Sequence, residues 1–462
     1  MIKKYIGNRA FYRRAMAIAL PIIIQNGITN FVSMLDNIMV GKVGQLEMSG
    51  VAIVNQLMFV FNLCIFGAVS GAGIFTAQFY GNQDQDGIRR TFRFKFIISL
   101  LISAIGIALL SAFGEPLIRL YMQGDDDPVA IAQTLQHGLD YLKVMLWGLL
   151  PFALANAYSS TLRETGKTLV PMVAGICAVV VNLILNYILI FGHLGFAPMG
   201  VRGAAYATII SRYVELTIVA GWTHLSSNKC PFIKGVYRSL YIPGSLLKKI
   251  IINGLPLMIN ELLWASSMAI MNQCYSTRGL DVVAAVNICS TLSNLTSVVF
   301  LSMGSVVGII MGQMLGAGTP ETELRDTNRK LIALSVFSCL IFGGLAMSFS
   351  GLFPRIYEAT DLAKTTATAL ICVSAAYMPF NAYNHGCYFT LRSGGKTIIT
   401  FIFDSGFAWL INVPLAFCLS RFTTLPIIPM YALCLSTDLI KCFLGTYMLK
   451  KGSWIQNLAK QA

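Results

Sequence analysis

The chain alternates long apolar segments with short polar ones along its whole length. Segments such as 96–113, 170–191 and 397–419 run for roughly 18 residues or more, which matches the thickness of a bilayer core. We therefore predict an all-α polytopic membrane protein whose twelve transmembrane helices cover residues 15–39, 47–79, 92–113, 129–162, 168–192, 201–225, 246–276, 281–316, 327–349, 362–391, 397–420 and 426–450.

Composition and charge fit this prediction. Of the 462 residues, 56% are hydrophobic and only 12% are charged, which is too little polar surface for soluble domains. The net charge of +14 could indicate a nucleic-acid partner, but the lysines and arginines gather in alternate loops, as at Arg89, Arg90, Arg93 and Lys95. This positive-inside bias explains the charge without nucleic acid. It predicts a multi-pass protein of the cell membrane, embedded in the lipid bilayer, with both termini in the cytoplasm.

The first six and last six predicted helices match each other at an offset of about 235 residues. Matching positions are Leu20-Pro21 and Leu255-Pro256, Gly44 and Gly279, Val51 and Val286, Gly73 and Gly308, Gln78 and Gln313, and Gly81 and Gly316. Thr161-Leu162-Arg163 and Gly166 recur as Thr390-Leu391-Arg392 and Gly395. We predict two parallel six-helix bundles, a lobe at 1–226 and a lobe at 246–462, joined by a cytoplasmic connector at 227–245.

Charged residues inside the predicted spans need a partner or a function, because a bilayer core does not solvate them. Three pairs are spaced three residues apart, so that each pair shares one helix face: Asp140 and Lys143, Arg212 and Glu215, and Asp438 and Lys441. We expect these pairs to neutralise each other and to have a structural role.

Three acids have no such neighbour on their own helix: Asp36, Glu261 and Asp404. A carboxylate in a spanning helix can bind a proton or a sodium ion, so these three are the candidate ion sites. The structural alternatives are that Asp36 faces water near the outer loop, that Glu261 stays protonated and hydrogen-bonded to another helix, and that Asp404 belongs to the inner membrane surface.

Uncharged polar residues accompany the acids in the pattern. Asn182 and Asn186 are four residues apart, hence on one helix face, and could offer amide oxygens to a cation beside Asp36. The predicted tenth helix has Tyr377, Asn381, Asn384 and His385. The alternative for all of them is interhelical hydrogen bonding.

The segments 34–41, 73–81 and 181–187, together with both Thr-Leu-Arg motifs, resemble the multidrug and toxic compound extrusion (MATE) antiporters, and the resemblance covers essentially the full chain. It implies a twelve-helix transporter that exports organic, often cationic, compounds in exchange for H⁺ or Na⁺. By the same resemblance, Asp36, Asn182 and Asn186 match a cation site of the first lobe, although many DinF-type relatives have an aspartate at the position of Asn186.

The resemblance extends to the second lobe. Glu261 and Tyr377 match a glutamate and a tyrosine of NorM-type members, while Asn381 stands where those members have an aspartate. A sodium ion could then bind at Asp36, Asn182 and Asn186, or at Glu261 and Tyr377, with Asp404 supplying the missing charge of the second site.

These observations predict a secondary active antiporter whose partners are a small organic substrate and H⁺ or Na⁺, with no other cofactor, working as a monomer. A lipid-linked precursor flippase is the alternative, but we expect such a protein to line its cavity with Arg or Lys, and the unpaired charges here are acidic. A receptor or enzyme is the third class, yet no nucleophile, base and orienting group occur at usable spacing.

Overall fold

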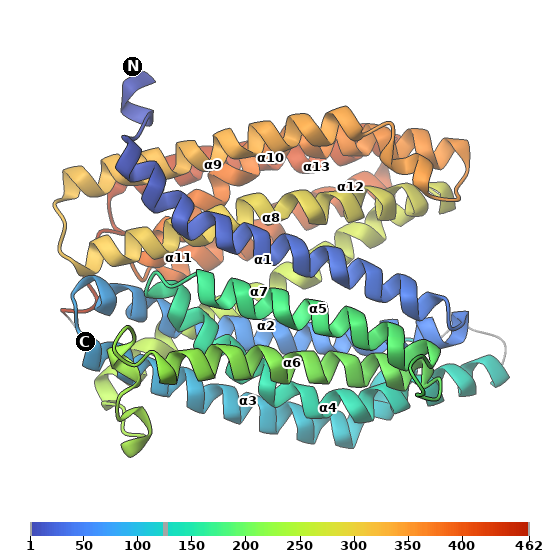
Figure 1. The fold of residues 1–462 in the computed structure, drawn as a ribbon. Helices are drawn as coiled ribbons and strands as arrows, with labels where there is room; N and C mark the ends of the chain where they lie inside the picture. Colours follow the sequence, from blue (N-terminus) through green and yellow to red (C-terminus); the bar gives the residue numbers. More distant parts are fainter. Residues whose placement is uncertain (1, 123–127, 461–462) are drawn as a thin grey trace. The chain divides into compact units, whose positions relative to one another are not determined.

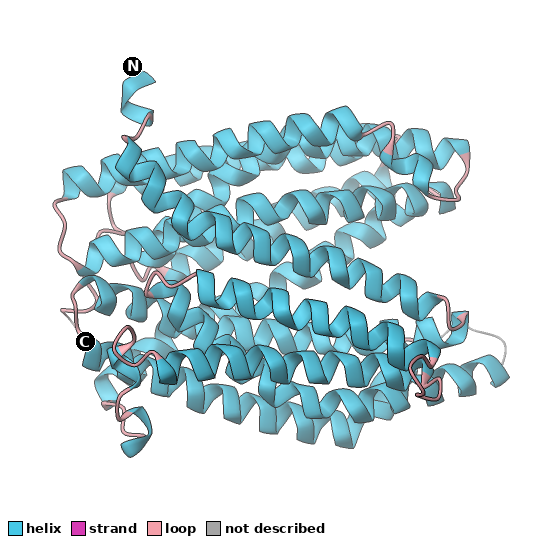
Figure 2. Ribbon diagram, in the orientation of Figure 1, coloured by secondary structure: helices cyan, strands magenta, loops and turns pink. Residues whose placement is uncertain are grey.

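The computed structural model describes residues 2–122 and 128–460, and within them the chain forms helices joined by loops, with no strand (Figure 2). The long helices of the first half are α1 Arg9–Gly41, α2 Gln45–Gly81, α3 Gln85–Leu120, α4 Pro128–Glu164, α5 Leu169–Phe191 and α6 Gly200–Leu225. Those of the second half are α7 Gly244–Ser276, α8 Leu280–Gly316, α9 Glu321–Phe349, α10 Asp361–Ser393, α12 Val413–Phe422 and α13 Ile427–Lys451. Short helices are η1 Ile2–Tyr5, η2 Pro231–Ile233, η3 Val236–Arg238, η4 Phe353–Ile356 and α11 Thr397–Phe401.

The predicted eleventh helix, 397–420, is not uniform. Between α11 and α12 the backbone forms two π-helical turns, η5 Ile402–Gly406 and η6 Ala408–Asn412. A π-helical turn widens the helix and changes which side chains share a face, and such turns are frequent at functional sites. The hydrophobic pattern gave no sign of them, because the segment is mostly apolar and reads as one continuous span.

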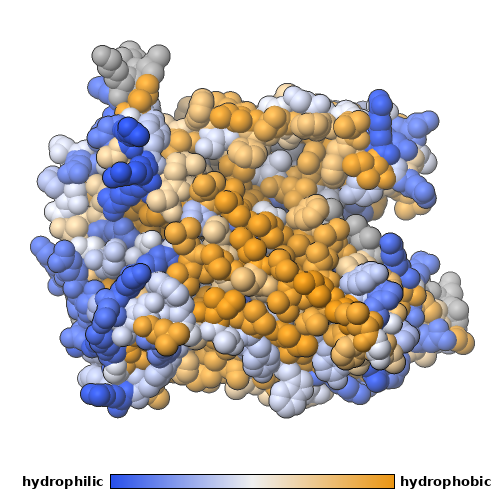
Figure 3. Space-filling view, viewed as in Figure 1, coloured by the Kyte–Doolittle hydropathy of each residue, from blue (hydrophilic) through white to orange (hydrophobic). Residues whose placement is uncertain are grey.

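Nine of the helices in the described ranges are long and apolar enough to cross a membrane. The predicted spans that fall outside this set are α6, α7 and α10. They carry polar residues of the sites described below, among them Arg212 in α6, Glu261 in α7 and Asn381 in α10. Figure 3 shows the expected surface, with apolar side chains over the middle of the helices and hydrophilic ones at their ends.

The chain forms two compact units. One, here called the N-unit, contains residues 24–76 and 85–247; the other, the C-unit, contains the residues up to 23, residues 77–84 and the residues from 248 onward. The predicted lobe boundary at 227–245 stays a prediction.

The N-unit is built on the packing of α6 against α4 and α5, and of α3 against α4 (Figure 1). Its core is aliphatic and aromatic, with Val54, Ile65 and Ile118 fully buried. Burial of this kind is the main source of stability once the helices are formed.

The C-unit centres on α10, which packs against α8, α9 and α13 (Figure 1). The last residues of α2 belong to this unit and cross the end of α8. A β-carbon on Gly81 would lie 1.8 Å from the Gln313 carbonyl oxygen, and one on Gly316 would lie 1.9 Å from that of Gln78. Only glycine allows the two backbones to approach so closely.

Gln78 also fixes the segment that follows α13. Its side-chain oxygen accepts a hydrogen bond from the Leu458 backbone N–H (2.6 Å), and its amide donates to the Ser393 carbonyl (2.8 Å). Both ends of the described chain lie at the same end of the C-unit helices (Figure 1), where Lys4 and Trp454 line one cavity. With an even number of spans, both termini of a chain must lie on the same side of the membrane.

Local backbone geometry matches between the repeated motifs. Gly166 and Gly395, which are equivalent positions, both have φ +75°, a left-handed conformation that glycine adopts without strain. The preceding threonines each donate to a carbonyl four residues back, Thr161 to Ala157 (2.9 Å) and Thr390 to Gly386 (2.7 Å).

Candidate functional site

Asp36 and the two asparagines of α5 come together in the N-unit. Asn186 donates from Nδ2 to Asp36 Oδ1 at 2.7 Å, and the same amide lies 3.2 Å from Asn182 Oδ1. Both asparagines are buried, with 2% and 6% of their surface exposed. The predicted contact between these three residues is confirmed, because a spacing of four puts both amides on the face of α5 that meets α1. Their role as an ion site stays a prediction.

The amide of Asn182 can face Asp36 in two ways. Only the orientation with its nitrogen toward α1 pairs donor with acceptor: that nitrogen then donates to the two Asp36 oxygens, at 3.0 and 3.1 Å. Asn186 Oδ1 is buried and has no hydrogen-bond partner among the described residues. The carboxylate and this amide oxygen are the kind of oxygen ligands to which a proton or a hard cation binds.

A cavity of about 320 Å³ adjoins the Asp36 carboxylate. Its walls include polar side chains from α1, α2, α4, α5 and α6, among them Ser33, Asn55, Asn62, Tyr141, Asn186, Thr208 and Arg212. Tyr141 OH lies 3.4 Å from Asn55 Oδ1. The acid is therefore connected to a polar space inside the N-unit rather than packed in an apolar core.

Arg212 of α6 is the cation within electrostatic reach of Asp36. It is also paired with Glu215, with Nη1 and Oε2 3.6 Å apart, so the predicted pair on α6 is confirmed. Its guanidinium stacks 4.7 Å from the Phe152 ring centroid. Because Arg212 also pairs with Glu215, Asp36 has no counter-ion to itself among the described residues.

Asp404 in the C-unit has a counter-ion of its own. Two predictions were wrong here. Lys441 Nζ lies 3.1 Å from Asp404 Oδ1, so Asp404 is not an unpaired acid. Lys441 was expected to pair with Asp438, three residues earlier on α13; that acid lies only within its electrostatic reach. The long lysine side chain reaches across to the π-helical segment, and a pattern along one helix cannot reveal a partner on another.

Asn260 of α7 completes the environment of Asp404. Its Nδ2 donates to Asp404 Oδ2 at 3.1 Å, and its Oδ1 accepts from the Ser405 backbone N–H at 3.2 Å. Ser405 Oγ donates to the Asn260 carbonyl at 2.7 Å. The η5 turn thus presents two consecutive residues, Asp404 and Ser405, to Asn260 of α7.

The remaining predicted residues of the second lobe are dispersed. Glu261 lies within electrostatic reach of Arg392 and Asp404 but has no hydrogen bond to the described residues. Tyr377 packs its ring 6.0 Å from that of Phe380, and no hydrogen bond within the described ranges links Glu261 to Tyr377 or Asn381. A sodium site at Glu261 and Tyr377 therefore stays a prediction.

The third predicted pair was also wrong. Asp140 binds Arg202 of α6, at 3.0 Å between Oδ2 and Nη2, instead of Lys143 on its own helix. An interhelical partner with a long side chain again replaces the neighbour three residues away.

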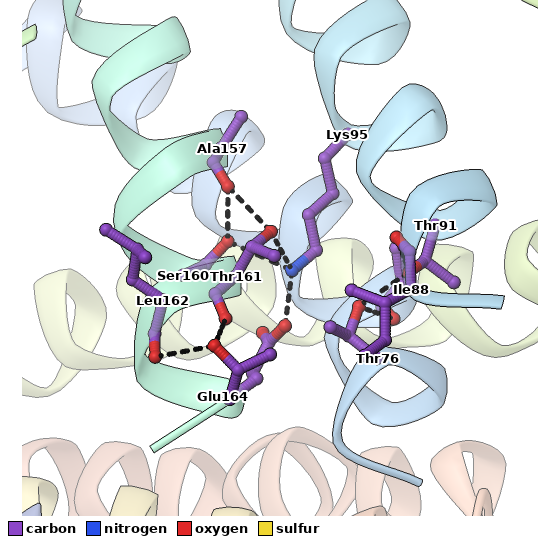
Figure 4. A network of polar contacts seen from close by, with 11 residues as sticks. Thr76, Ile88, Thr91, Lys95, Ala157, Ser160, Thr161, Leu162 and Glu164 are labelled. Atoms are coloured by element: carbon purple, nitrogen blue, oxygen red, sulfur yellow. Dashed lines mark hydrogen bonds and ion pairs between the residues drawn. The ribbon is translucent and has the colours of Figure 1, made fainter. Parts of the chain in front are cut away.

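Sequence reasoning missed a second buried ion pair (Figure 4). Lys95 was counted among the basic residues of the inner side, but it is fully buried in α3 and pairs with Glu164 at the end of α4. Its Nζ also donates to Ser160 Oγ (3.1 Å) and Thr161 Oγ1 (3.2 Å). Lys95 directly precedes the apolar run 96–113 and follows three arginines, so it looked like part of the basic end of the helix. The repeat gave no hint, because Lys330 at the equivalent position pairs with Asp326 on its own helix.

Comparison with known families gives one match over most of the chain. The family model MatE matches residues 21–188 and 256–418. The two matched segments fall one in each half of the repeat.

Curated relatives match over nearly their whole length. The probable multidrug resistance protein NorM of Thermotoga maritima is 22% identical over 442 residues, covering 96% of this chain and 93% of the relative. The probable multidrug resistance protein YoeA of Bacillus subtilis is 25% identical, covering 90% and 88%.

Solved structures share the fold. An outward-facing multidrug resistance MATE family transporter of the MOP superfamily superposes with a TM-score of 0.87 at 18% identity, covering 100% of this chain and 99% of that one. A MOP superfamily transporter from Pyrococcus furiosus, described as having a binding pocket of reverse polarity, gives a TM-score of 0.85 at 17% identity, covering 98% and 97%.

Proposed function

Because the chain belongs to the MatE family of multidrug and toxic compound extrusion transporters, we propose that it is a secondary active antiporter that exports organic, often cationic or amphipathic, compounds in exchange for H⁺ or Na⁺. In this proposal the two lobes rock between states open to either side. The names of the relatives, multidrug resistance proteins, support efflux of small organic molecules. They do not favour the lipid-linked precursor flippase.

The ion site of this proposal is Asp36 with Asn182 and Asn186, and one observation carries it. A carboxylate inside a membrane protein is bound only by neutral amides, beside a polar cavity and next to a buried amide oxygen without a partner. The free energy of placing such a charged acid in a bilayer is high unless the acid binds an ion or faces water.

Ion binding would change the contacts of Asp36 in a defined way. The free carboxylate accepts from Asn186; a protonated carboxyl group also donates, and the unpaired Asn186 Oδ1 is an available acceptor. A sodium ion would draw the same amide oxygens toward itself. Either ion weakens the attraction between Asp36 and Arg212. Ion binding at α1 therefore changes the forces on α6, which packs against α4 and α5. The ion must bind the two access states with different affinity to drive transport.

The experiment is export of a fluorescent organic cation from proteoliposomes under an imposed pH gradient or an imposed sodium gradient. We expect one gradient to drive export in the wild type. Asp36→Asn should lower this gradient-driven export about 5- to 150-fold, the range given by a coupling free energy of about 1–3 kcal/mol. Asp140→Asn is the matched control, because Arg202, its partner, has 57% of its side chain exposed and is left in contact with solvent.

Glu261→Gln separates the two lobes. If this variant loses gradient-driven export and Asp36→Asn keeps it, the ion site lies in the second lobe and the assignment to Asp36 is wrong. Export that neither gradient drives contradicts antiport as a whole.

A further inference from the structure

The Asp404 carboxylate in the C-unit is held by groups of the protein on both oxygens. Oδ1 meets the Lys441 ammonium at 3.1 Å and Oδ2 meets the Asn260 amide at 3.1 Å. Only 11% of the Lys441 side chain and 21% of the Asp404 side chain are exposed. The pair therefore lies inside the helix bundle, not at its surface.

The surroundings hold the ammonium at this position. Lys441 Nζ lies 5.4 Å from the Phe403 ring centroid and 5.6 Å from that of Phe407, both within the range of cation–π attraction. Both rings come from the same irregular segment as Asp404. The segment is itself tied to α7, since the Trp409 indole donates to the Leu263 carbonyl at 3.0 Å.

Other charged or titratable groups near the pair make the positive charge necessary. Asp438 of α13 and Glu261 of α7 are acids within electrostatic reach of Asp404, and His385 and Arg392 come from α10. Arg392 is within electrostatic reach of Glu261, so that without Lys441 Asp404 would lack a cation in contact with it, in a medium that does not solvate charge.

A monovalent cation bound at a carboxylate and a lysine ammonium in the same place contribute the same single charge. We infer that Lys441 is a covalently attached substitute for a coupling cation: its ammonium fills the cation position at Asp404, so that the C-unit binds no exchangeable ion there. Exchangeable binding is left to Asp36, whose hydrogen-bonding partners in the described residues are neutral amides. This inference rests on the proposed antiport and names the residue that restricts ion coupling to one half of the molecule.

The inference predicts that removing the Lys441 ammonium opens a cation site at Asp404. Lys441→Met removes the ammonium and keeps an unbranched side chain, and so leaves Asp404 with Asn260 and an open cation position. The test is equilibrium binding of radioactive sodium to purified protein in alkaline, potassium-free buffer. It is made in the Asp36→Asn background, so that sodium bound at the first site does not contribute.

In this background we expect no sodium bound at Asp404 when Lys441 is present, and one additional sodium ion per protein after Lys441→Met. Adding Asp404→Asn should abolish the additional binding, and Lys441→Arg, which keeps the charge, should not create it. Lys441→Gln repeats the measurement with a polar side chain in case the Met variant does not give monodisperse protein.

Two results overturn the inference. One is that folded Lys441→Met and Lys441→Gln proteins bind no additional sodium; the other is that the parent protein with Lys441 already binds sodium that Asp404→Asn removes. Neither result depends on whether Asp36 drives transport, because binding, not export, is measured. Conversely, wild-type export that is indifferent to Asp36→Asn contradicts the proposed function and leaves the sodium result at Asp404 standing.

Discussion

In the N-unit, the Asp36 carboxylate is hydrogen-bonded by an asparagine amide and shares Arg212 with Glu215, whereas in the C-unit Asp404 has an asparagine amide and its own lysine. The two acids do not occupy equivalent positions of the repeat. The alignment that pairs Gly166 with Gly395 also pairs Gly175 with Asp404. The duplicated helices have therefore kept their places while the acid has moved from one helix to another.

The residues that face these two positions, Gln25 and Asn260, differ between the repeats. Gln25 and Asn260 are equivalent in the repeat, yet Gln25 accepts a hydrogen bond from Arg163 (2.8 Å) and Asn260 donates one to Asp404. A β-carbon at Gly175 would lie 2.8 Å from the Gln25 amide nitrogen, so a side chain at this position would require Gln25 to shift. Duplication preserved the backbone geometry, and the chemistry of each half then diverged by changing single partners.

The largest expected effect on stability comes from breaking the Asp404–Lys441 pair on one side only. Asp404→Asn leaves a buried ammonium without its carboxylate, and we expect the unfolding free energy in detergent to fall by about 3–5 kcal/mol. The double variant Asp404→Asn/Lys441→Met should recover much of this loss. Asp36→Asn should cost far less, because no dedicated ion pair is broken. Equal losses for the two acids would contradict the contrast between the units.

A smaller effect is expected from the two asparagines that contact the acids. Asn260→Ala leaves the Ser405 N–H and one Asp404 oxygen without their partner, which should cost about 1–3 kcal/mol. Asn186→Ala removes an amide whose oxygen is already unpaired within the described ranges, so it should cost less. Thermal unfolding of the two single variants, purified in the same detergent, compares them; a costlier Asn186→Ala would show that the first site is the more tightly built one.

The smallest effect is expected at Glu115, which pairs with Arg119 at 2.8 Å on α3 with about half of each side chain exposed. Glu115→Gln should change the unfolding free energy by about 0–1 kcal/mol, because exposed ion pairs contribute little. This variant measures the background against which the buried pairs are judged. A loss as large as that of Asp404→Asn would mean that the burial of charge is not what separates the two classes.

Sequence patterns predicted the helices and the first site, and missed the second, for physical reasons. Hydropathy marks a span, and a spacing of four puts Asn182 and Asn186 on one helix face. Their grouping with Asp36 of another helix was implied by the family resemblance. The partner of Asp404 was hidden because it lies on another helix and because the π-helical turns at 402–412 change the phase of the side chains. Lys95 was hidden differently: a lysine next to a basic loop looks like a loop residue, and only the packing of α3 on α4 shows that it is buried.

The crossing of α2 and α8 has a consequence for the symmetry of the repeat. Gly81 lies against the carbonyl of Gln313 while Gly316 lies against the carbonyl of Gln78, and each pair is the other with the two repeats exchanged. Such a reciprocal contact is isologous, the kind that two identical subunits make around a twofold axis. Each repeat therefore carries both halves of this contact on one helix, a glycine and a carbonyl that faces the glycine of the other repeat.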